Sequence, residues 1–142
     1  MISYEAKITR QMLRDNSDTL FVFGDNLIRR GLGGQAREMR GEPNAVGIPT
    51  KRLPSMEPEA FFTDHDFETW REHSAKDWGR LLSHVKRGGR IVIPAAGIGT
   101  GLARLEEKAP KIAIAIRDGI AVLAKLAAEQ DLTAIDNEPS PF

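Results

Sequence analysis

The sequence contains no cysteine, and this absence excludes disulfide bonds and thiolate chemistry. It also lacks any apolar run of about 18 residues, the length that marks a membrane-spanning helix. Its first residues, MISYEAKITRQMLRD, include no continuous apolar stretch of the length found in signal peptides. We therefore expect a cytoplasmic protein without a membrane partner.

A net charge is missing as well. The 20 Lys and Arg residues balance the 20 Asp and Glu residues, so no overall positive field attracts nucleic acid. Hydrophobic residues make up 41% and charged residues 28% of the 142-residue chain, which is typical of an ordinary globular protein. A chain of this length has room for one core, so we expect one domain over residues 1–135 and a C-terminal tail over residues 136–142.

Three short apolar segments have the composition of buried strands: residues 19–26 (TLFVFGDN), 44–50 (NAVGIPT) and 89–94 (GRIVIP). Each is rich in β-branched or aromatic residues, with turn formers nearby. Helical patterns alternate with them, a short one over residues 35–40 and long ones over residues 67–85 and 106–126. This alternation predicts a single-domain α/β fold with a mixed, mostly parallel sheet and helices on both faces.

The helix expected over residues 67–85 carries both tryptophans of the chain. Trp70 and Trp78 share an apolar stripe with Leu81 and Val85, which favours a role in the core over stacking on a ligand. The Asp-His-Asp cluster at residues 64–66 lies where this helix should begin. Capping and solvation explain the cluster better than a metal site, and we expect no metal.

Two glycine-rich loops, GDNLIRRGLGG (24–34) and AAGIGTG (95–101), directly follow predicted strands. Because ligands of parallel sheets bind beyond the carboxyl ends of the strands, both loops could approach one ligand. Glycine-rich loops can turn several backbone N–H groups toward an anion, so a phosphate or diphosphate is the expected guest. Neither loop has the spacing of a Walker or dinucleotide motif. The alternative is that the glycines only make tight turns.

The order of these residues resembles the macrodomains, a family that binds ADP-ribose, over roughly residues 20–123. In macrodomains, a strand ends in an asparagine that contacts the distal ribose, and a glycine-rich segment then opens a helix; Asn26 and the following glycines match this order. A later loop wraps the diphosphate, and residues 97–102 match it. The resemblance implies a macrodomain-like fold that needs no cofactor. The ligand-binding residues that we assign from it are Gly31, Gly33, Gly34, Thr50, Gly97, Ile98, Gly99, Thr100, Gly101 and Leu102.

The chain is most similar to a branch of macrodomains that releases ADP-ribose from proteins or DNA bases. Members carry a threonine-lysine pair after the middle strand and a GxGLxxL stretch at the diphosphate loop. Thr50 and Lys51 match the pair, and residues 99–105 (GTGLARL) match the stretch. By this resemblance, Lys51 attacks the anomeric carbon of the distal ribose or otherwise drives release, and Asn26 assists it. A lysine that is merely solvated at a strand end is the alternative.

Catalysis by Lys51 has a physical requirement, because an ammonium with a pKa near ~10.4 is not a nucleophile at neutral pH. To lose its proton, the Lys51 ammonium must be desolvated or must lie close to other positive charges, and Arg52, Arg29 or Arg30 could supply those charges. Those arginines could equally bind phosphate. The chain also departs from the protein-directed members of the branch, because Ala103 stands where they have an acid-base aspartate.

Asp25 is the nearest other carboxylate in sequence, and it could serve as the acid-base group or bind adenine or a ribose hydroxyl. Two function classes therefore stay open. One is an ADP-ribosyl hydrolase that acts on a modified macromolecule or small molecule, with nucleic acid as a partner only in modified form. The other is a module that binds or sequesters ADP-ribose or a related nucleotide without turnover. The sequence leaves the oligomeric state undetermined.

Overall fold

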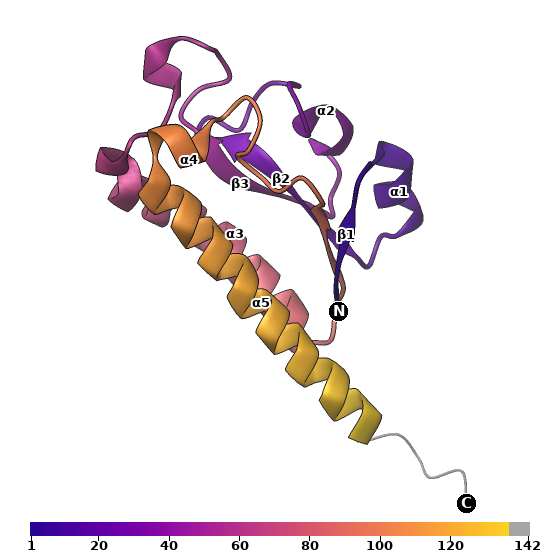
Figure 1. Ribbon diagram of the computed structural model, residues 1–142. Helices are drawn as coiled ribbons and strands as arrows, with labels where there is room; N and C mark the ends of the chain where they lie inside the picture. Colours follow the sequence, from indigo (N-terminus) through magenta and orange to yellow (C-terminus); the bar gives the residue numbers. More distant parts are fainter. Residues whose placement is uncertain (137–142) are drawn as a thin grey trace, which may run out of the picture.

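The computed structural model describes residues 1–136 and shows a β-sheet flanked by helices (Figure 1). Its four strands lie in the order β1-β4-β2-β3, and every pairing is parallel. Because parallel strands end at the same edge, the segments after β2, β3 and β4 all leave the sheet at its carboxyl edge. The strands are β1 (Ile2–Glu5), β2 (Leu20–Asn26), β3 (Ala45–Lys51) and β4 (Ile91–Pro94).

Helices cover both faces of the sheet. Two long helices, α3 (Phe67–Lys86) and α5 (Pro110–Asp136), pack against one face, as Figure 1 shows. Two short helices, α1 (Arg10–Asp15) and α2 (Ala36–Met39), pack against the other. The connecting segments contain the 3₁₀ helices η1 (Pro58–Ala60) and η2 (Asp64–Asp66) and the short helix α4 (Leu105–Lys108).

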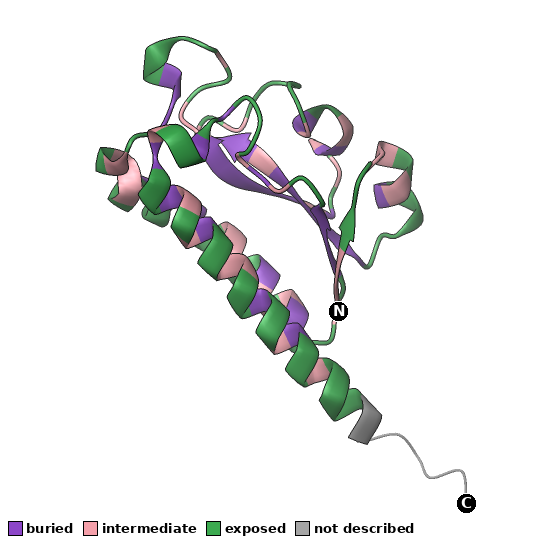
Figure 2. Cartoon of the chain, viewed as in Figure 1, coloured by how far each residue is buried: buried purple, intermediate pink, exposed green. Residues whose placement is uncertain are grey.

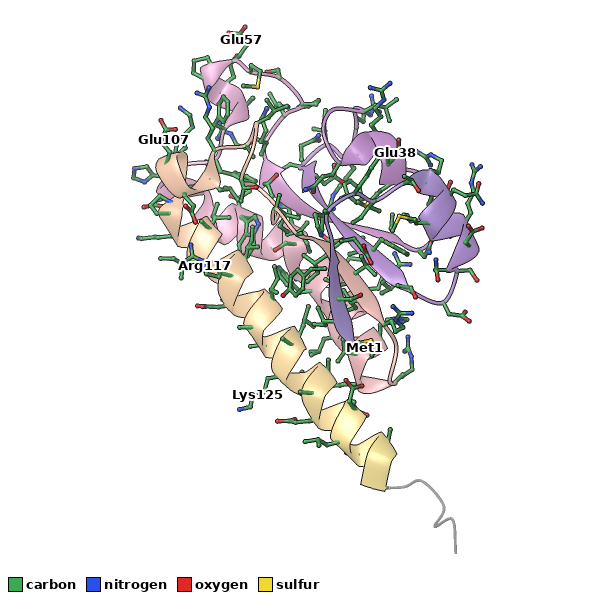
Figure 3. The ribbon with its side chains drawn as sticks, turned by 45° about the vertical axis from the view of Figure 1, so that its right-hand side comes forward. Met1, Glu38, Glu57, Glu107, Arg117 and Lys125 are labelled. Carbon is green, nitrogen blue, oxygen red and sulfur yellow. The ribbon has the colours of Figure 1, made fainter. Side chains whose placement is uncertain are left out.

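The alternation of side chains along β2 divides the core into two parts. Leu20 and Val22 belong to the cluster formed with α3 and α5, whereas Phe21 and Phe23 belong to the cluster formed with α1 and α2. Successive side chains of a strand point to opposite faces, so a strand covered on both sides is apolar throughout. Figure 2 shows β2 and β3 buried over most of their length. The continuous apolar run in TLFVF is thereby explained.

The predicted α/β architecture is confirmed, and the mostly parallel sheet is all parallel within residues 1–136. β1 and α1 carried no clear sequence signal, and β3 lies at an edge of the sheet although most of its residues are buried. The predicted helix over residues 106–126 is divided into α4 and α5 just before Pro110. Proline has no N–H and clashes with the preceding turn, so it is tolerated only at a helix start.

At its C-terminal end, α5 continues to Asp136, so the first residue of the expected tail is helical. The remainder of that tail, residues 137–142, lies outside the described residues. Within the described part of the chain, no helix is both long and apolar enough to cross a membrane.

Candidate functional site

A cleft of about 320 Å³ lies at the carboxyl edge of the sheet. Its walls come from the ends of β2 and β3, from the first glycine loop (residues 27–35), from the second glycine loop (residues 95–104), from the segment after β3 (residues 54–56) and from Ala36 and Arg40. Figure 1 shows both loops beyond the carboxyl ends of the central strands. The residues that line the cleft are Gly24, Asp25, Asn26, Arg30, Gly31, Leu32, Gly33, Gly34, Gln35, Ala36, Arg40, Thr50, Lys51, Pro54, Ser55, Met56, Gly99, Thr100, Gly101, Leu102 and Ala103.

The carbonyl groups of the first glycine loop are held by side chains of its surroundings. Arg40 donates from Nε to the Gly31 carbonyl at 2.7 Å, and Asn26 donates from Nδ2 to the Arg30 carbonyl at 2.7 Å. Gly31 and Gly34 have positive φ angles of 98° and 56°, a conformation that other residues rarely adopt. The backbone N–H groups of residues 31–35 donate no hydrogen bond to any described residue.

The second glycine loop is built in a similar way. Gly97 and Gly99 have φ angles of 86° and 77°, and the Gly99 carbonyl accepts a hydrogen bond from the Leu105 N–H at 3.0 Å. A side chain on Gly99 would collide with Leu105, whereas Gly101 faces open space. Across residues 98–103 the backbone N–H groups have no acceptor in the part of the chain that the structure describes. Both loops can therefore offer several unpaired donors to an anion in the cleft.

Gln35 connects the two loops, a role that sequence reasoning missed. Its Oε1 accepts from the Gly24 N–H at 2.8 Å, and its Nε2 donates to the Gly97 carbonyl at 3.0 Å. The side chain thus joins the end of β2 to the second glycine loop, at Gly97, which lies 62 residues after Gln35 in the chain. A glutamine after a run of glycines has no pattern specific to this role, so only the spatial arrangement reveals it.

Asp25 lines the cleft, but its carboxylate is already engaged. The side chain is 3% exposed, and Arg40 contacts Oδ1 at 2.5 Å and Oδ2 at 3.3 Å. Oδ1 also accepts from the Asn26 N–H at 2.8 Å, and Arg29 lies 3.7 Å from Oδ2. The carboxylate packs against Gly47 of the neighbouring strand, where a Cβ would stand only 2.5 Å from Oδ2. The glycine at this position therefore leaves the space that the carboxylate occupies. These contacts favour a structural role over the acid-base or adenine-binding roles considered from the sequence.

Asn26 and Lys51 lie side by side, as their positions at the ends of neighbouring strands predict. They are register partners in the pairing of β2 with β3, and both line the cleft. The Asn26 amide, however, holds the Arg30 backbone through both its nitrogen and its oxygen. Lys51 donates from Nζ to the Ser55 carbonyl and lies 4.8 Å from the centre of the Phe61 ring. Both predicted catalytic side chains are therefore oriented by contacts within the protein.

The arginines that could crowd Lys51 contact other groups. Arg52 pairs with Asp66 at 3.1 Å, and Arg29 pairs with Asp77 of α3 at 2.7 Å. Burial alone lowers the pKa of Lys51 below its ordinary value, because a low-dielectric environment disfavours the ammonium.

We predict that Lys51 titrates below the ordinary lysine pKa of ~10.4. Reductive methylation with ¹³C-formaldehyde makes each lysine visible in an NMR titration, and the Lys51→Arg variant identifies the resonance of Lys51. A titration midpoint in the ordinary range would contradict the prediction and would leave burial too weak to activate this amine.

Other predicted ligand-binding residues divide between the cleft and the core. Thr50 lines the cleft, but it is buried and donates from Oγ1 to the Asp25 carbonyl at 3.2 Å. Ile98 is buried in the core cluster beneath the loop and does not line the cleft, nor does Gly97. Ile98 anchors the loop to the core, since the glycines on either side of it have no side chain that could pack there. The remaining predicted residues, Gly31, Gly33, Gly34, Gly99, Thr100, Gly101 and Leu102, all line the cleft.

Positive charge exceeds negative charge in this cleft. Arg30, Arg40 and Lys51 line it together with a single carboxylate, that of Asp25. Arg30 is exposed, and its guanidinium makes no hydrogen bond or ion pair with the residues described. The Arg30 side chain and the unpaired N–H groups of the two loops give the cleft the character of an anion site.

Comparison with known proteins places the chain among sequences of undetermined role. No curated protein and no solved structure matches it. One family model matches residues 3–119, a span that includes β2, β3 and β4, all of β1 except Ile2, both glycine loops and the whole cleft. The chain therefore belongs to the family of unknown function DUF7831.

Proposed function

We propose that this protein binds the diphosphate of ADP-ribose, or of a related nucleotide, in the cleft between the two glycine loops. The observation that carries the proposal is the pair of backbone segments, residues 31–35 and 98–103, whose N–H groups find no acceptor among the described residues. Segments that contribute to one cleft from two sides suit two adjacent phosphates. The excess of positive side chains in the cleft supports the same ligand class.

The resemblance to macrodomains supports ADP-ribose as the first ligand to test. Asn26, Lys51 and the loop glycines other than Gly97 line one cleft, an arrangement that suits their proposed roles around a ribose and a diphosphate. The contacts of Asn26 and Lys51 within the protein favour binding over turnover. We therefore propose a binding module as the primary function.

Hydrolysis of an ADP-ribosyl bond is the second candidate function. The observation in its favour is the half-buried position of Lys51 at the cleft, because this partial burial lowers its pKa. A neutral Lys51 amine that releases the Ser55 carbonyl could bond to the anomeric carbon while the bond from that carbon to the modified group breaks, with a proton passing to the departing group. Water would then hydrolyse the lysine adduct, which frees ADP-ribose and restores the amine. Single-turnover release of ADP-ribose from modified DNA and modified protein tests this candidate. Equal rates for wild type, Asn26→Ala and Lys51→Ala would exclude it.

We predict that Gly101→Glu lowers the affinity for ADP-ribose by about 100-fold, because a like charge at a binding site costs several kcal/mol. Gly101 has open space around it and no positive φ angle, so the fold should tolerate the change. Calorimetric titration measures the affinity. Gly79→Glu is the matched control, because Gly79 also faces open space, but on α3 and outside the cleft.

An unchanged affinity in a folded Gly101→Glu variant would contradict the proposed binding site. A loss of the same size in Gly79→Glu would attribute the effect to overall charge rather than to the cleft.

A further inference from the structure

Selection of one base requires side chains that present hydrogen-bonding groups to its edge. An amide reads adenine through its oxygen and nitrogen together, and a carboxylate accepts from an exocyclic amino group. Sites built in this way reject the wrong partner strongly, because their polar groups are then left unpaired. The polar side chains of the cleft can be tested against this requirement one by one.

Both amides that line the cleft are engaged at both ends. Asn26 uses Nδ2 and Oδ1 on the Arg30 backbone, at 2.7 and 3.4 Å. Gln35 uses Oε1 on the Gly24 N–H and Nε2 on the Gly97 carbonyl. Turning either amide toward a base would break two hydrogen bonds that shape the glycine loops. Neither amide is therefore oriented to read a base.

The single carboxylate of the cleft is unavailable for the same purpose. Asp25 is 3% exposed, and both of its oxygens are contacted by Arg40. Releasing it would leave a buried charge without its partner, which is unfavourable. An exocyclic amino group of adenine or cytosine therefore finds no free carboxylate among the residues that line the cleft.

Two of the three hydroxyl groups that line the cleft donate to the backbone, and the third, that of Ser55, accepts from the Glu57 N–H at 3.3 Å. A hydroxyl can both donate and accept, so it can pair with any base edge and does not select one. Thr50 donates to the Asp25 carbonyl at 3.2 Å, and Thr100 donates to the Ala96 carbonyl at 2.9 Å. Lys51 donates to the Ser55 carbonyl. Arg30 keeps a guanidinium without a hydrogen bond to the described residues, and a phosphate is its strongest available partner.

Apolar surface is what the cleft offers to the base itself. Leu32, Met56 and Leu102 line the cleft and are 63%, 51% and 61% exposed, and Pro54 lies in the same wall as Met56. Apolar side chains pack against the flat face of a base, which every base possesses, so the contact depends little on which base it is. Contacts of this kind increase the affinity for a nucleotide without favouring one base over another.

We infer that the cleft binds nucleoside diphosphate compounds through the diphosphate and the face of the base, without selecting the base. This inference rests on the proposed diphosphate site. It widens the ligand class from ADP-ribose to the diphosphates of guanosine, uridine and cytidine and to their sugar conjugates. In this reading Asp25, Asn26 and Gln35 shape the loops and do not touch the base.

The test compares nucleotides whose bases have the same size but different edges. Calorimetric titrations with ADP and GDP, and with CDP and UDP, keep the stacked area nearly constant within each pair. We expect the two dissociation constants of each pair to agree within about threefold, since no edge is read. A preference of about tenfold or more within either pair would overturn the inference.

Two variants separate this inference from the proposed function. Pro54→Ser and Met56→Ser should weaken all four nucleotides several-fold while leaving inorganic diphosphate unchanged, because both side chains line the cleft outside the two glycine loops. Loss of inorganic diphosphate in the same variants, or unchanged nucleotide binding, would place the base elsewhere and overturn the inference. If wild type binds neither inorganic diphosphate nor any nucleotide, the proposed function itself fails.

The Arg30→Ala variant tests whether the guanidinium of Arg30 contacts the phosphates or the base. Arg30→Ala should weaken all four nucleotides and inorganic diphosphate by the same factor, as expected for a contact with phosphate. A selective loss of GDP would show that Arg30 reads guanine, which would contradict the absence of base selection.

Discussion

The Arg40→Met variant is expected to lose about 3–5 kcal/mol of unfolding free energy, the usual cost of removing one partner from a buried ion pair. Arg40 is the principal partner of Asp25, whose side chain is 3% exposed. Methionine retains an apolar chain against the Phe23 ring, over which the guanidinium lies at 5.6 Å. The loss therefore reports chiefly on a buried carboxylate that keeps only the more distant Arg29 as an ionic partner, and on the loop carbonyls that Arg40 holds.

Urea denaturation measures this change in stability. Arg37→Met is the matched control, because Arg37 lies on α2, the helix that Arg40 directly follows, and its exposed side chain makes no hydrogen bond to the described residues. We expect the control to stay within about 0.5 kcal/mol of wild type, as surface substitutions usually do. Equal stability of both variants would mean that the Asp25–Arg40 pair contributes nothing net to the fold.

The Trp70→Ala variant is also expected to lose about 3–5 kcal/mol, which is typical when a buried aromatic side chain is truncated. Trp70 is 4% exposed and lies in the cluster between the sheet and the long helices. Its Nε1 donates to the Pro49 carbonyl of the edge strand β3 at 2.9 Å. The side chain therefore fills the core and also pairs a backbone carbonyl on strand β3.

Trp70→Phe separates the two contributions and serves as the milder variant if the alanine variant does not fold. It keeps most of the apolar volume but leaves the Pro49 carbonyl without its donor, so we expect a loss of about 1–3 kcal/mol. Thermal or urea unfolding gives both values. A loss of nucleotide affinity in Trp70→Phe without any loss of stability would contradict the core role and favour a ligand-stacking one.

Most of the architecture was predictable from local patterns. Buried parallel strands must be apolar on both faces, so TLFVF, AVGIP and IVIP were recognisable without any partner. The apolar stripe of the long helix α3 predicted that helix, whereas the division of the helix expected over residues 106–126 at Pro110 was not predicted. β1 was missed because only four residues, ISYE, form it, and they are half-buried or exposed. A short edge strand has too few constrained positions to create a pattern.

The location of the cleft was also predictable, for a geometric reason. Parallel strands bring the segments at their carboxyl ends to one edge, so two glycine loops that follow two such strands must meet there. Asn26 and Lys51 were expected at this edge, and they are register partners in neighbouring strands. Ile98 was wrongly placed among the cleft residues, because spacing within a loop does not indicate which side chain turns toward the core.

By itself, the sequence determined the α/β class, the main strands and long helices, and the edge where the glycine loops gather, because each depends on periodicity or on chain direction. Only the tertiary structure decided how the polar groups of the cleft are used. Gln35 bridges loops 62 residues apart in sequence, and Arg40 reaches Asp25 from another element. Hydrogen bonds of this kind depend on distances of a few ångströms between segments that no local pattern relates.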